Sequence, residues 1–119
     1  MKPTDLTNDE ILEGWINELR DLAHLYAKAK GERMQLEEFR KVRKHTLMKR
    51  AEQDGYNAIG AQEREAYAHP EYERLIRGLA EATEKEAKAL WNLRIEEMRF
   101  EAWRTNQANH RAERMRYGS

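Results

Sequence analysis

The side chains that could carry acid–base or metal chemistry are few and scattered. The four histidines are His24, His45, His69 and His110, and none lies three or four residues from another. Zinc ligands usually recur at short spacings such as H-E-x-x-H, so the sequence predicts neither a metal site nor a cofactor. We expect His24 to lie near a helix stripe and His69, just before Pro70, to shape a helix entry.

The sequence also lacks the features of a nucleophile or a nucleotide-binding loop. Without cysteine, the chain cannot form a disulfide, a thiolate metal site or a cysteine nucleophile. It has no G-x-x-x-x-G-K-[ST] loop, no G-x-S-x-G turn and no G-x-G-x-x-G. Its many carboxylates alternate with bases along helix faces, without the pairing that acid–base catalysis needs. We therefore expect a protein that is not an enzyme.

Charge is balanced overall but unevenly distributed. The formal net charge is +0, yet residues 5–21 carry six acidic residues against one basic residue. Two basic clusters follow, the first without any acidic residue: Arg40, Lys41, Arg43, Lys44, Lys49 and Arg50, and then Arg104, Arg111, Arg114 and Arg116 beyond Trp103. Acids at helix starts and bases at helix ends complement the helix dipole, and salt bridges could absorb other charges. The remaining excess predicts phosphate contacts, with Trp103 either in the core or stacked on unpaired bases.

The longest element that the sequence predicts is a helix over residues 70–103. Pro70 suits a first helical turn, and the apolar residues that follow recur at gaps of three and four. They are Tyr72, Leu75, Ile76, Leu79, Ala82, Thr83, Ala87, Leu90, Trp91, Ile95, Met98 and Ala102. A helix this long cannot bury its stripe alone, so another element must cover it.

A second long helix is predicted to begin after Thr7. Thr7 and Glu10 have the spacing of a capping box, and Gly55 is expected in the left-handed position past the helix end. Near Gly31 the helix either breaks or continues with a drifting stripe. We favour near-continuity with a bend allowed, because no proline or cap follows. One row of apolar residues along this helix continues through Leu36. In the other row, the equivalent positions 33 and 40 are arginines.

These elements predict an all-α fold, a long antiparallel helical hairpin of two helices. Its connector over 56–69 includes a short helix at 61–68. With 119 residues the chain is expected to be one domain, frayed over 1–6 and 106–119. Two helices leave large aromatics uncovered, so we expect a homo-oligomer. No apolar run approaches 18 residues, which predicts a soluble cytoplasmic protein.

Several phrases resemble a group of small phage proteins, mostly uncharacterised, that tend to be encoded beside recombination genes such as those of single-strand annealing proteins. The resemblance spans about residues 22–114. It rests on YAKAK at 26–30, LEEFRK at 36–41, QEREAYAHPEY at 62–72 and FEAWRT at 100–105. In layout the chain is also similar to the UvsY-type phage recombination mediator. That likeness implies a ring-like oligomer that binds single-stranded DNA and helps to load a recombinase.

The expected function is therefore that of a phage-encoded accessory protein of DNA recombination or replication. It would bind single-stranded DNA, a recombinase or annealing protein, or both, in the host cytoplasm. Two alternatives stay open. One is an inhibitor of a host nuclease or CRISPR effector that uses the acidic N-terminal region as a phosphate mimic. The other is a helical virion or scaffolding protein.

Overall fold

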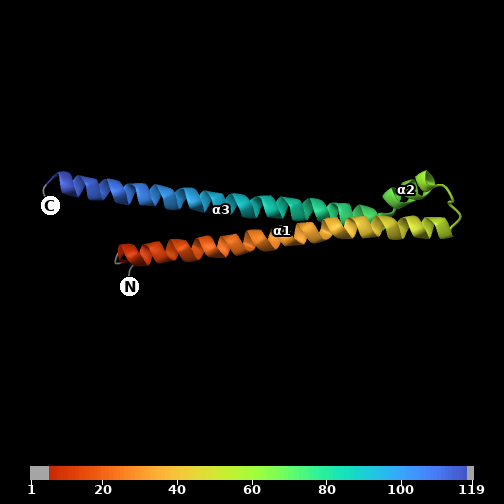
Figure 1. Cartoon of the computed structure of the whole chain (residues 1–119), viewed down its shortest axis with the longest axis horizontal. Coiled ribbons are helices and arrows are strands. Elements are labelled where there is room, and N and C mark those ends of the chain that lie inside the picture. Colours follow the sequence, from red (N-terminus) through yellow and green to blue (C-terminus); the bar gives the residue numbers. More distant parts are fainter. Residues whose placement is uncertain (1–5, 118–119) are drawn as a thin grey trace. The chain divides into compact units, whose positions relative to one another are not determined.

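The computed structural model describes residues 6–117, and within this range it contains three helices and no strand. Helix α1 spans Asn8–Gln53, α2 spans Ile59–Ala68 and α3 spans Pro70–Arg116 (Figure 1). The chain divides into two compact units. The first combines Met1–Tyr26 with Lys88–Ser119, and the second is Ala27–Ala87. Both long helices contribute to both units. The three helices, without a strand in residues 6–117, confirm the all-α prediction.

The start of α1 confirms the predicted capping box. The Glu10 amide donates to Thr7 Oγ1 at 3.1 Å, and the Thr7 amide donates to Glu10 Oε2 at 3.1 Å. Each contact satisfies a backbone N–H that has no partner within the helix. The helix then continues through Gly31 without a break, as favoured from the sequence, because no proline or competing cap interrupts its backbone hydrogen bonds.

The end of α1 is a Schellman motif. The Gly55 amide donates to the Glu52 carbonyl at 3.1 Å, and the Tyr56 amide donates to the Ala51 carbonyl at 3.0 Å. This reversal requires a left-handed residue, and Gly55 has φ of +103°. The predicted role of Gly55 is therefore confirmed, and the chain turns sharply toward α2.

A single residue, His69, separates α2 from α3. Its Nδ1 accepts a hydrogen bond from the Glu71 amide at 3.1 Å, and its carbonyl accepts from the Tyr72 amide at 3.0 Å. His69 thus satisfies free amides at the start of α3, while Pro70 occupies a position that needs no amide hydrogen. This geometry confirms that His69 shapes a helix entry.

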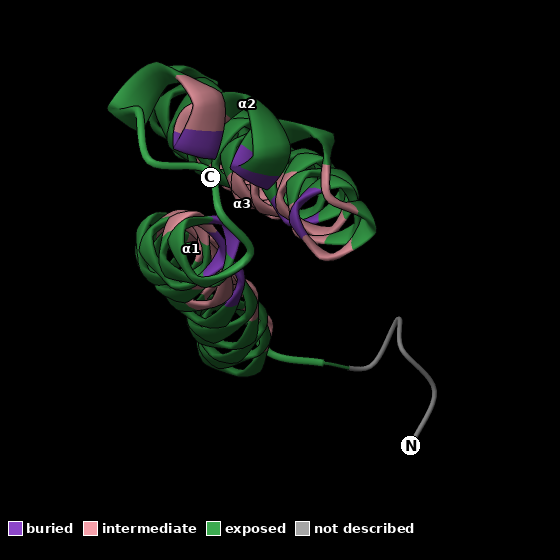
Figure 2. Cartoon of the chain, turned by 90° about the vertical axis from the view of Figure 1, so that its right-hand side faces the viewer, coloured by how far each residue is buried: buried purple, intermediate pink, exposed green. Residues whose placement is uncertain are grey.

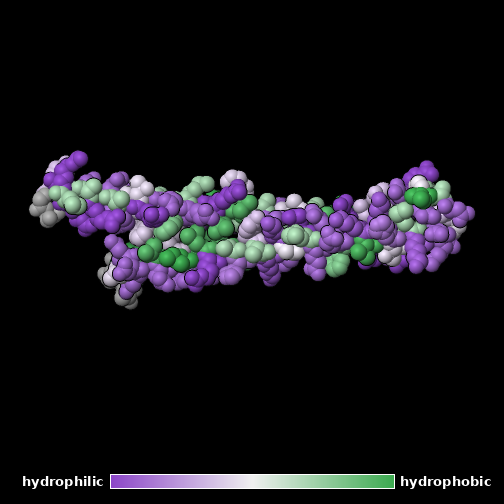
Figure 3. Space-filling view, in the orientation of Figure 1, coloured by the Kyte–Doolittle hydropathy of each residue, from purple (hydrophilic) through white to green (hydrophobic). Residues whose placement is uncertain are grey.

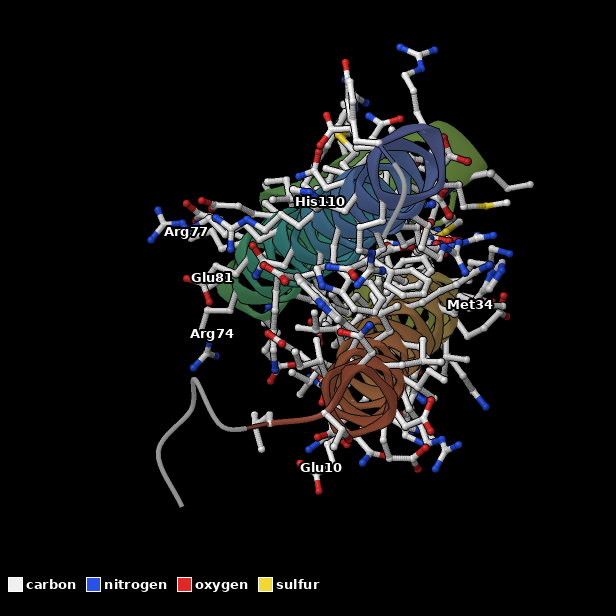
Figure 4. All side chains as sticks on the ribbon, turned by 90° about the vertical axis from the view of Figure 1, so that its left-hand side faces the viewer. Glu10, Met34, Arg74, Arg77, Glu81 and His110 are labelled. Carbon is white, nitrogen blue, oxygen red and sulfur yellow. The ribbon has the colours of Figure 1, made fainter. Side chains whose placement is uncertain are left out.

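The buried centre of the second unit lies where its three helical segments meet. Leu47 of α1, Ala66 of α2 and Tyr72 of α3 form one cluster, with Met48 packed against it. The Tyr67 and Tyr72 rings add an edge-to-face contact with centroids 5.3 Å apart. Figure 2 shows the buried parts of these segments turned toward one another. By contrast, Met34, Arg77 and Glu81 extend outward into solvent (Figure 4).

In each unit α1 and α3 are antiparallel. Arg33 contacts Glu86 and Arg43 contacts Glu71 in the second unit, while Trp15 contacts Phe100 in the first. Side chains that are buried or half-buried recur along α3 at alternating gaps of three and four. They are Tyr72, Leu75, Leu79, Ala82 and Glu86 in the second unit, and Ala89, Leu93, Glu96, Phe100, Trp103 and Gln107 in the first. This period of 3.5 residues is that of paired, coiled helices.

Several positions of the predicted apolar stripe do not lie in this seam. Ile76, Trp91, Ile95 and Met98 are exposed, although Leu90 is half-buried as predicted. The half-buried positions also include Glu96 and Phe100, and Phe100 contacts Trp15 of α1. The apolar residues recur slightly more slowly than the 3.5-residue contact seam, so the two patterns separate along the helix. Figure 3 shows hydrophobic surface over the first unit, where α1 and α3 lie side by side.

Helix α3 continues to Arg116, through residues 106–116, where fraying was predicted. Thr105, Asn106 and Asn109 are weaker helix formers, but each costs only a few tenths of a kcal/mol. Arg114 and Arg116 in the last turn complement the helix dipole. Of the predicted frayed ends, residues 1–5, 118 and 119 lie outside the described residues.

Candidate functional site

The basic segment of α1 faces acidic residues of its own unit. Arg43 Nη1 lies 2.9 Å from Glu71 Oε2, and Arg50 Nη1 lies 3.3 Å from the same oxygen. The hydrogen bond from Arg43, with the nearby charge of Arg50, holds the pKa of Glu71 below its usual value. Two predicted phosphate contacts are therefore engaged with one carboxylate at the start of α3.

Lys41 and Lys44 also have carboxylate partners. Lys41 Nζ lies 3.2 Å from Glu38 on the exposed side of α1, and Lys44 Nζ lies 3.8 Å from Glu63 of α2. Lys44 also lies over the Tyr67 ring, 5.0 Å from its centroid. The interaction with the Tyr67 side chain raises the pKa of Lys44. Four of the six basic residues in this segment thus have internal ion pairs.

The other two residues of the segment differ from these four. Lys49 is exposed, whereas Arg40 is half-buried. The Nε atom of Arg40 is buried and has no hydrogen-bond partner within the described residues. Arg40, Lys41 and Lys44 line a pocket of about 200 Å³ together with His45, Tyr67 and Tyr72. The structure therefore brings three of the predicted contact residues to one place.

The second basic cluster, near the end of α3, also contains both residues with contacts inside the chain and residues that are exposed. Trp103 is half-buried and stacks on Phe100, with ring centroids 6.2 Å apart. Arg104 lies over Phe100 and contacts Glu101 at 3.2 Å. Trp103, Arg104 and Arg111 line one groove of about 590 Å³ in the first unit. Arg114 and Arg116 lie exposed in the last turn of α3.

A second candidate surface is the outer apolar face of α3, formed by Trp91, Ile95 and Met98. Their exposed fractions are 53%, 44% and 60%. At about 100° per residue, Trp91 and Met98 lie roughly 140–160° around the helix from the seam residue Leu93. Ile95 lies closer to α1, because it lines a groove of about 330 Å³ together with Glu18 and Leu22. The Arg94 guanidinium lies over the Trp91 ring at 5.2 Å. Trp91 and Met98 can therefore contact an apolar surface while α1 remains in place.

Sequence reasoning missed the acidic partners and this outer face. Residues 63–73 already showed an acidic excess, and a hairpin brings that stretch beside the basic segment. The signal for the outer face was the mismatch between the apolar spacing and the 3.5-residue period of paired helices. Neither pattern can be interpreted until it is known which residues of α1 and α3 lie side by side.

Neither metal ligation nor membrane insertion is indicated by the described residues. Residues 6–117 contain no group of three or more His, Asp or Glu side chains placed to hold a metal ion. No helix in this range is long and apolar enough to cross a membrane. The chain matches no protein-family model, no curated protein and no solved structure.

Replacing Glu71 with Gln should make the protein less stable at neutral pH, because Arg43 and Arg50 lose their shared carboxylate. Since folding lowers the pKa of Glu71, its stabilising effect is present above about pH 4.3, the unfolded glutamate value. It is lost as the pH falls through the lower folded value. Urea unfolding of both proteins across pH 2–7 measures the difference.

The matched control for this prediction is Glu65→Gln, which changes an exposed carboxylate on α2. Glu65→Gln should follow the wild-type pH dependence. A stability difference for Glu71→Gln that is equal at pH 7 and pH 2 would contradict the ion-pair explanation.

Proposed function

We propose that this protein is a non-enzymatic accessory protein of phage DNA recombination or replication that acts as a homo-oligomer in the host cytoplasm. It holds a recombinase or annealing protein, single-stranded DNA, or both. The observation that carries this proposal is the outer apolar face of α3, which fits an interaction protein. The resemblance to small phage proteins encoded beside recombination genes supports the biological setting.

The exposed surface supports assembly with further copies. A standard interface buries roughly 800 Å² on each partner. Exposed apolar residues on the outer face supply the type of surface that such an interface would cover.

Of the two proposed ligands, a protein partner has the stronger structural support. Four of the six basic residues in the first cluster already contact carboxylates. Phosphate binding there would have to compete with these contacts. The Arg40 pocket and the exposed arginines near the end of α3 remain the candidate contacts for DNA.

Two measurements test the proposal. Sedimentation equilibrium at micromolar concentration should give a mass above 14.2 kDa, and a monomer at every concentration would remove the oligomer. Binding to a fluorescent single-stranded oligonucleotide should weaken with salt, with a log–log slope of about −0.7 for each phosphate neutralised. Absence of binding at low salt would remove direct DNA contact and leave the protein partner as the ligand.

A second candidate function, inhibition of a host nuclease or CRISPR effector, is favoured by the acidic start of α1. Asp9, Glu13, Glu18 and Asp21 are exposed. None of them contributes to the ion pairs of the described chain. Such a surface can imitate DNA phosphates. Charge reversal of Asp9, Glu13 and Asp21 should then abolish inhibition, while Arg43→Gln with Lys44→Gln should leave inhibition intact.

A further inference from the structure

The pocket beside Arg40 has a composition that suits an anion. It lies in the second unit, between the basic stretch of α1 and the tyrosines of α2 and α3. Arg40, Lys41, Lys44 and His45 come from consecutive turns of α1, and no carboxylate lines the pocket. Guanidinium and ammonium groups supply only hydrogen-bond donors, so the pocket offers donors to an acceptor-rich ligand.

Arg33 shows how the same helix satisfies an arginine that lies one heptad before Arg40. The Arg33 guanidinium forms an ion pair with Glu86 of α3 and lies 2.9 Å from Glu37. Both arginines are half-buried, yet Arg40 has no ion pair within the described residues. A half-buried cation without a counter-charge is unfavourable, and this contrast makes Arg40 the candidate anchor.

The neighbouring ion pairs do not complete the coordination of Arg40. Glu38 contacts Lys41 from the exposed side, and Glu63 is 3.8 Å from Lys44. Neither carboxylate lines the pocket. The Lys44 ammonium instead lies over the Tyr67 ring, at the boundary between α1 and α2. Lys41 and Lys44 therefore line the pocket without bringing a carboxylate into it, and a phosphate held there would compete with Glu38 and Glu63 for these two ammonium groups.

We propose that this pocket is a phosphate-binding site in which Arg40, Lys41 and Lys44 hold the oxygens of a phosphate group. Its volume of about 200 Å³ corresponds to several waters at about 30 Å³ each. It is smaller than the roughly 300–1,000 Å³ of pockets for drug-sized ligands. The phosphate group can belong to a DNA backbone, to a strand end or to a free phosphate.

This phosphate site would be one of the DNA contacts of the proposed function. It rests on that function only if the phosphate belongs to a nucleic acid. Inorganic phosphate tests the pocket without DNA. Thermal unfolding at constant ionic strength should show a saturable rise in Tm with sodium phosphate but not with sodium chloride. Lys44→Gln should weaken the phosphate affinity at least about tenfold, because it removes a charged hydrogen bond.

Arg40→Gln should weaken the phosphate affinity to a similar extent. The double variant Lys41→Gln with Lys44→Gln should also weaken it, and this variant leaves the residues between α1 and α3 unchanged. The control is Arg77→Gln, which removes the same charge from the outer side of α3 in this unit, where Arg77 contacts Glu73. Arg77→Gln should bind phosphate like the wild type. Equal weakening by the control, or the absence of a saturable wild-type response, would overturn the site.

Oligonucleotides with and without a 5′ phosphate identify the source. Tighter binding of the phosphorylated strand, lost in Lys44→Gln, indicates a strand end. Equal binding of both strands, weakened equally by Lys44→Gln, indicates a backbone phosphate. Response to inorganic phosphate alone supports the pocket while contradicting the proposed DNA function. An acidic side chain of a second copy could instead occupy the pocket. In that case phosphate will not raise the Tm of the wild type, and Lys44→Gln will not change the response to phosphate. That result would contradict the phosphate site.

Discussion

Leu47→Ala should lower the free energy of unfolding by about 2–5 kcal/mol, because it removes buried methyl groups and leaves a cavity. Leu47 is 2% exposed and lies in the cluster formed with Ala66 and Tyr72. Three helical segments meet there, so the neighbouring side chains cannot close the gap without moving a helix. Urea unfolding followed by circular dichroism measures the loss.

The matched control is Val42→Ala on the same helix. Val42 is largely exposed, so its truncation should change the unfolding free energy by no more than about 0.5 kcal/mol. A loss below about 1 kcal/mol for Leu47→Ala would show that the three segments do not share a stable core in solution.

Combining Ile95→Lys with Met98→Glu should convert the proposed oligomer into a 14.2 kDa monomer. The pair of changes keeps the net charge unchanged while placing two charges on the outer apolar face of α3. Although the new Lys and Glu are three residues apart and can pair with each other, burying both charges in an apolar interface would still be unfavourable because of their desolvation. The same positions are exposed in the single chain, so unfolding of the monomer should change by only about 0.5 kcal/mol per site.

Sedimentation equilibrium of the wild type and the double variant measures this effect. Met115→Glu with Tyr117→Lys is the control, because it makes the same types of change at exposed positions near the end of α3. This control should retain the wild-type mass. A double variant on the outer face that still assembles like the wild type would contradict the role of that face.

Features governed by neighbouring residues could be predicted well from the sequence. The Thr7–Glu10 capping box, the left-handed Gly55 and the entry at His69 and Pro70 all depend on contacts within a few residues. The connector helix was predicted at 61–68 and spans Ile59–Ala68. Local backbone geometry and hydrogen bonding determine these features before any long-range contact forms.

Features that depend on the pairing of helices could not be predicted in the same detail. The seam on α1 was seen to run into Arg33 and Arg40, but only the structure places Glu86 beside Arg33. Likewise, the charge excess at positions 43 and 50 gave no sign that Glu71 would contact both arginines. These contacts join residues 21 to 53 positions apart, so their geometry depends on how α1 and α3 are aligned.

The Arg33–Glu86 pair selects one register between α1 and α3 in the second unit. Apolar seams tolerate sliding by a heptad, because one leucine or alanine replaces another at each contact. A slide that brought Leu79 opposite Arg33 would instead leave the guanidinium without Glu86 and in contact with an apolar side chain. Each misaligned pairing therefore loses a charge contact as well as apolar packing. A polar pair within the seam thus acts against incorrect alignments, a role distinct from its contribution to the stability of the correct one.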